Sequence, residues 1–100
     1  MSRVWIQGAL IMGNVMLVYR IMPEDPNKDL EEIKAEIENI VEEHGEYKGA
    51  SEEKVAFGLK AVIARIVIPD AGGLVDKIEE SLSNIEGVQS VEAQDITLID

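Results

Sequence analysis

The chain has 100 residues, of which 46% are hydrophobic and 4% aromatic, so it is long enough for one domain with an aliphatic core. It contains no cysteine, which excludes disulfides, thiolate metal sites and a cysteine nucleophile. The formal net charge of −11 argues against nucleic acid or an anionic membrane surface as the main partner, and favours a basic partner or only solubility.

Residues 1–11 do not fit the pattern that follows them. They lack the three-part organisation of a signal peptide. The apolar stretch Val4–Tyr19 contains polar residues and glycines, and it is too short to cross a bilayer. Because Met12–Gly13 resembles a second start, we expect residues 1–11 to be an N-terminal extension that is disordered, loosely docked through Trp5, or non-native. Residues 12–100 are then expected to form a single domain.

The first strand is predicted at Asn14–Met22, where side chains alternate between two faces and Arg20 marks the more exposed face. Pro23–Pro26 is a rigid turn, because proline fixes φ and lacks an N–H group. The polar segment Glu46–Lys54 is expected to be a short, weak edge strand that runs into a loop, with its lysines protecting the edge.

A first helix is predicted between these strands, at about Leu30–Glu43, where apolar side chains recur at helical spacing. Asp29 or Asn27 is suited to cap its N-terminus. Gly45 is suited to the left-handed conformation that often follows a helix, and His44 lies near the negative end of the helix dipole.

The most apolar segment of the chain, Val55–Asp70, organises the rest. It begins as a turn at Phe57–Gly58, and from Leu59 to Ile68 it is rich in β-branched residues without Gly or Pro. Pro69 ends it, because proline belongs at a strand end. This pattern predicts a central strand with neighbours on both edges.

The second half of the domain repeats the pattern of the first half. Asp70–Gly73 is a turn that precedes a helix at about Leu74–Asn84, and Val88–Ile99 is the last strand, kinked around Ala93–Asp95. The order β-α-β-β-α-β predicts an α+β ferredoxin-like fold. In this fold a four-stranded antiparallel sheet carries two helices on one face.

The sequence offers little chemistry for an enzyme. The single histidine, His44, is more simply a charge complement at a helix end than a base. The carboxylates stand in runs that are typical of solvated faces. Acylphosphatases, small enzymes of this fold, need an arginine in the loop after the first strand, and here that loop, Pro23–Asp29, is acidic and has none. Asp70–Gly73 is at most a weak anion site. We therefore expect no enzyme, metal or cofactor.

Two surfaces are candidates for a partner. Phe57 lies in a turn, where it is either a core plug or a wedge for a partner's pocket, and its chemistry does not decide between these. The sheet face away from the helices is expected to stay rather apolar, which suits self-association or partner docking. That face should present Met16, Val18, Met22 and Ile63 beside Arg20 and Arg65.

From Met12 to the C-terminus the chain resembles the small archaeal translation elongation factor one-beta family, and it is similar to the exchange domain of the eukaryotic counterpart. The likeness is most specific at Met22–Pro23, Ala56–Leu59 and Gly87–Val91. It implies a cytoplasmic guanine-nucleotide exchange factor for elongation factor one-alpha, with no covalent catalysis, membrane or direct nucleic-acid contact. It also implies that Phe57 inserts into the GTPase and that Ala56, Gly58 and Leu59 shape its loop.

The chain departs from the eukaryotic relatives in one respect. They carry a lysine near the C-terminus that disturbs the magnesium and phosphate region of the GTPase. Aligning their corresponding segment with Val88–Ser90 places that lysine at Leu98, and no basic residue follows Lys77. If the chain exchanges nucleotide, it must therefore do so without that lysine, by wedging and switch displacement alone. The rival interpretation is a ferredoxin-like regulatory or oligomerisation module that uses its open sheet face.

Overall fold

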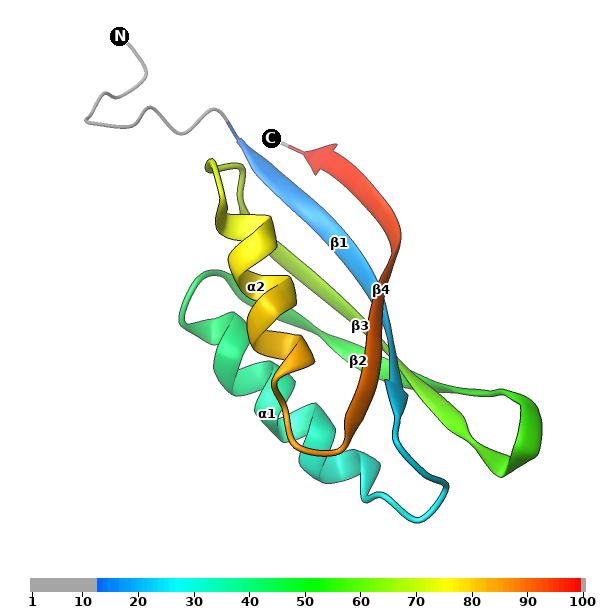
Figure 1. Cartoon of the computed structure of the whole chain (residues 1–100). Coiled ribbons are helices and arrows are strands. Elements are labelled where there is room, and N and C mark those ends of the chain that lie inside the picture. Colours follow the sequence, from blue (N-terminus) through cyan, green and yellow to red (C-terminus); the bar gives the residue numbers. More distant parts are fainter. Residues whose placement is uncertain (1–12, 100) are drawn as a thin grey trace, which may run out of the picture.

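A computed structural model describes residues 13–99, which form one sheet and two helices in the predicted order (Figure 1). The expectation for residues 1–11 lies outside the described part of the chain. The elements are β1 (Asn14–Pro23), α1 (Leu30–Glu42), β2 (Glu46–Lys54), a short 3₁₀ turn (Ala56–Gly58), β3 (Lys60–Pro69), α2 (Leu74–Ser83) and β4 (Val88–Ile99).

The strands are ordered β2-β3-β1-β4, and each neighbouring pair is antiparallel. Both helices lie on the same side of this sheet (Figure 1). The predicted ferredoxin-like α+β fold is therefore confirmed. The predicted kink in the last strand is also present: the β1–β4 register shifts between Asp95 and Ala93, which leaves Gln94 as an extra residue in β4.

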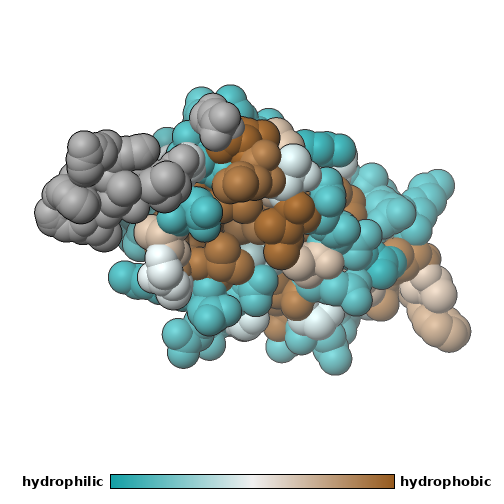
Figure 2. All heavy atoms as spheres, turned by 90° about the horizontal axis from the view of Figure 1, so that it is seen from above, coloured by the Kyte–Doolittle hydropathy of each residue, from teal (hydrophilic) through white to brown (hydrophobic). Residues whose placement is uncertain are grey.

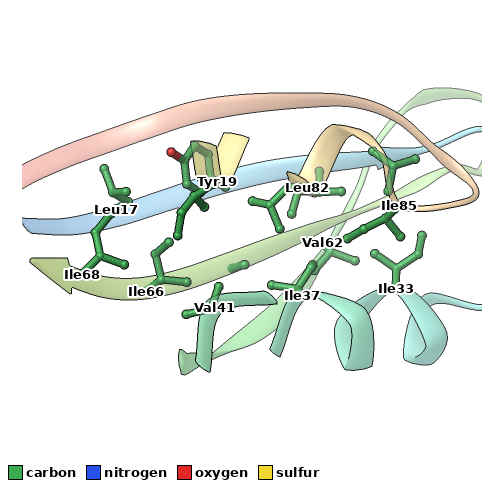
Figure 3. Packing of buried hydrophobic residues seen from close by; sticks show 14 of the residues in the cluster. Leu17, Tyr19, Ile33, Ile37, Val41, Val62, Ile66, Ile68, Leu82 and Ile85 are labelled. Atoms are coloured by element: carbon green, nitrogen blue, oxygen red, sulfur yellow. The ribbon is translucent and has the colours of Figure 1, made fainter. Parts of the chain in front are cut away.

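The core lies between the sheet and the helices. Burial alternates along β1 as predicted, with Leu17, Tyr19 and Ile21 fully buried. Figure 3 shows Leu17 and Tyr19 pointing into the same layer as side chains from α1, α2 and β3. This layer is aliphatic except for the tyrosine, in agreement with the composition. Its helical members are Ile33, Ile37, Val41, Ile78 and Leu82.

The ends of α1 confirm one prediction and correct another. Asp29 is the cap, because its Oδ1 accepts a hydrogen bond from the backbone N–H of Glu31 at 3.0 Å. Gly45 follows the helix as expected, but its φ is not positive. A Cβ there would clash with the carbonyl oxygen of Val67. Gly45 is therefore needed for close approach to β3, and the expected left-handed cap was wrong.

The open sheet face carries both apolar and charged side chains, as the sequence indicated. Met16, Val18 and Met22 are half-buried there, but Arg20 lies among them. The Arg20 guanidinium approaches carboxylates on both edge strands, Glu53 at 3.5 Å and Glu92 at 3.9 Å. Self-association through this face stays a prediction.

Candidate functional site: an exposed aromatic finger

The hairpin of β2 and β3 extends beyond the end of α1 (Figure 1). Lys54 and Lys60 form the last residue pair of its ladder, and Val55–Leu59 joins them. We call residues Lys54–Lys60 the finger. It protrudes at the right of Figure 2, where apolar and hydrophilic side chains lie side by side. The sequence predicted a turn here, but not that it would project from the domain.

The backbone of the finger forms a tight, hydrogen-bonded turn. The Val55 N–H donates to the Leu59 carbonyl oxygen at 2.9 Å, and the Leu59 N–H donates to the Ala56 carbonyl oxygen at 3.2 Å. Between them, Phe57 has φ 63° and ψ 30°, and Gly58 has φ 76°. Two consecutive positive φ values are the signature of a type I′ turn, which favours Asn and Gly at its centre.

Phe57 is therefore an unusual residue for its position. It is the one described non-glycine residue with positive φ, a conformation that is strained for a bulky side chain. The residue is also 92% exposed, so the core-plug interpretation is wrong. This phenylalanine therefore does not stabilise the fold, because its ring is not buried and its backbone conformation is strained. Strain and an exposed ring at one residue point to a role outside the fold.

The structure brings the four candidate residues together in this one turn. Ala56, Phe57 and Gly58 are exposed at its tip, and Leu59 is half-buried just before β3 begins. A shallow hollow of about 310 Å³ lies on the finger itself, lined by Val55, Gly58, Leu59 and the two flanking lysines. The turn can therefore present an aromatic ring to a cavity in a partner. That it does so stays a prediction at this point.

The remaining sequence candidates do not form a site. His44 is half-exposed just beyond α1. Within residues 13–99, no group of three or more His, Asp or Glu side chains is arranged to hold a metal ion. The two described helices are also too short or too polar to cross a membrane.

Besides Phe57, the structure exposes two apolar residues that the sequence did not indicate, Ile96 and Leu98, which are 58% and 66% exposed. They pair with Leu17 and Val15 and so lie on the helix side of β4. A helix of ten residues spans about 15 Å, whereas twelve strand residues span about 40 Å. β4 is also an edge strand, and the helices leave its C-terminal part uncovered while they cover Val15 and Leu17 beside it on β1. Comparing these two lengths in the sequence would have indicated that part of β4 extends beyond the helix, but not which of its residues are exposed.

The fold and the finger thus define a small ferredoxin-like sandwich that presents an aromatic turn. The sequence model of the "EF-1 guanine nucleotide exchange domain" matches residues 16–99. The chain is 42% identical over 88 residues to "Elongation factor 1-beta" of Archaeoglobus fulgidus, covering 88% of this chain and 100% of that protein. It is 44% identical over 85 residues to the protein of the same name in Methanothermobacter thermautotrophicus, covering 85% and 96%. The chain belongs to the EF-1 guanine nucleotide exchange domain family.

Proposed function

We propose that this protein is a guanine-nucleotide exchange factor that promotes replacement of GDP by GTP on elongation factor one-alpha during protein synthesis. Membership of the exchange family supports the activity, and the names of the archaeal relatives support the place in translation elongation. The observation that carries the assignment of the site is the ring of Phe57, held 92% exposed on a strained turn.

The proposed mechanism needs no covalent step. The factor binds the GTPase with an empty or loosened nucleotide site more tightly than the loaded GTPase. By linkage, its binding weakens GDP by the same factor. A hundredfold preference corresponds to about 2.7 kcal/mol of coupling free energy. GDP then leaves faster, and GTP refills the site. The protein is accordingly not an enzyme in the covalent sense, and it acts in the cytoplasm, where translation takes place.

The finger has a shape that suits insertion into the GTPase and so could couple binding of this protein to release of GDP. The Phe57 ring stands clear of the domain, and the turn that holds it is closed by two backbone hydrogen bonds. Because the backbone turn is already ordered, it loses little conformational freedom when the ring enters a pocket, so more of the free energy of burying the ring is available to distort the GTPase. Ala56, Gly58 and Leu59 shape the turn around it.

Exchange would proceed without a basic residue at the end of β4. Leu98, the position to which the resemblance assigns the eukaryotic lysine, is exposed near the start of β1. The finger lies at the opposite end of the long axis of the molecule (Figure 1). Wedging by Phe57 would therefore supply the displacement. The net charge of −11 favours encounter with a basic, tRNA-carrying partner.

The test is the release of fluorescent GDP from elongation factor one-alpha in a stopped-flow instrument, with excess unlabelled GTP. The proposal predicts that the release rate rises with the concentration of this protein and then saturates. An unchanged rate at saturating protein would overturn it. That result would favour the regulatory or oligomerisation module, and sedimentation would then test for assembly through the open sheet face.

A further inference from the structure

The finger carries an electrostatic arrangement that the fold does not need. Lys54 and Lys60 stand directly opposite each other in the last pair of the β2–β3 ladder. In an antiparallel pair, directly opposite side chains share one face of the sheet, and like charges in that position destabilise the hairpin. Both lysines are exposed.

Neighbouring carboxylates do little to relieve this repulsion. The ammonium group of Lys60 lies 3.9 Å from Oε1 of Glu52. Glu52 is held more closely by Lys34, whose ammonium lies 2.8 Å from its Oε2. Hydrogen bonding by Lys34 is also the main reason that the pKa of the Glu52 carboxyl is lowered. Within residues 13–99, Lys54 takes part in no ion pair.

The tip is thus a positive point on an acidic molecule. Residues Lys54–Lys60 contain two lysines and no carboxylate, whereas the whole chain has a net charge of −11. Strained backbone, an exposed ring and opposed like charges meet within these seven residues. A hairpin end that served only stability would avoid all three.

We infer that Lys54 and Lys60 bind carboxylates on the rim of the protein pocket that receives Phe57, and so orient the ring for entry. This rests on the proposed function, because the pocket belongs to the GTPase. A protein with an acidic rim is favoured over nucleic acid, since the overall charge of −11 repels phosphates. The acidic body attracts a basic partner from a distance, and the two lysines determine which end docks.

The test compares Lys54→Gln, Lys60→Gln and the double variant with Lys77→Gln, an exposed lysine of α2 that is also without an ion pair among the described residues. Association with nucleotide-free elongation factor one-alpha is measured from low to about 1 M salt. At low salt, each finger substitution should weaken binding about twofold to fivefold. Lys77→Gln should leave binding unchanged or slightly stronger, because it makes the body more acidic.

The loss should disappear in about 1 M salt, where screening acts over about 3 Å, and the melting temperature of the double variant should be equal to or higher than that of the wild type. Equal binding by wild type and double variant, alongside normal exchange by the wild type, would overturn this inference and leave the proposed function intact. A wild type that neither binds nor promotes exchange would overturn both. If the double variant lost affinity for tRNA and kept affinity for the GTPase, the partner class would be wrong.

Discussion

The hydroxyl of Tyr19 in β1 donates a hydrogen bond to Oε2 of Glu79 in α2, at 3.0 Å. The Tyr19 side chain is otherwise buried in the core, so this bond connects the centre of the sheet to a half-buried carboxylate of the helix. Burial raises the pKa of the Tyr19 phenol, and the Glu79 carboxylate raises it further by the hydrogen bond and by its charge. The fold therefore holds this tyrosine protonated.

This pair predicts a loss of stability in alkali. A pKa that is higher in the folded state stabilises the fold fully below the unfolded pKa of about 10, and the contribution is lost as pH rises above that value. We expect Tyr19→Phe to cost about 1–2 kcal/mol at pH 7 through the lost hydrogen bond. Urea unfolding at pH 8 and pH 11 checks this: the wild type should lose more stability between the two than the variant. Equal losses of stability in the wild type and the variant would contradict a raised Tyr19 pKa in the folded state.

Gly45 predicts a large effect from a single methyl group. Because a Cβ at this position would clash with the backbone carbonyl oxygen of Val67 and lie 2.9 Å from the Ile68 side chain, the segment that follows α1 must move away from β3 to admit it. We expect Gly45→Ala to lower the free energy of unfolding by about 1–3 kcal/mol. Gly72→Ala is the matched control, since a Cβ there has no neighbour within 4 Å and its φ is not positive. A similar loss in both variants would show that packing at Gly45 is not the cause.

The turn geometry predicts that Phe57 reduces the stability of its own domain. Asn is favoured at the centre of a type I′ turn, so Phe57→Asn should raise the free energy of unfolding by about 1 kcal/mol. Chemical denaturation measures this directly. A clearly less stable Phe57→Asn protein would mean that the ring packs onto the domain in solution.

The order of strands and helices could be predicted because each element carries its own local signal. Local periodicity indicated the alternation of β1 and the helical stripe of α1 that ends at Val41. A local break in the alternation indicated the irregularity around Gln94 in β4. Gly45 could not be interpreted correctly in this way. A glycine after a helix satisfies the rule for a left-handed cap, and only the position of β3 shows that close approach is the actual requirement.

The candidate site was half visible in the sequence. The resemblance located Ala56–Leu59, but an aromatic residue beside a glycine fits a buried plug as well as an exposed wedge. The distinction depends on how far the hairpin projects beyond α1, which is a tertiary property (Figure 1). Predicting that Lys54 and Lys60 lie opposite each other also requires the strand register, which the turn length alone does not determine.

The most direct measurement is the rate of GDP release from elongation factor one-alpha with wild-type protein and with Phe57→Ala, together with the thermal unfolding of each. Phe57 is 92% exposed, so its truncation should leave the melting temperature unchanged or slightly raised. Stimulated GDP release should fall at least tenfold, equivalent to about 1.4 kcal/mol of lost coupling. A stable Phe57→Ala protein that still accelerates release like the wild type would contradict the account.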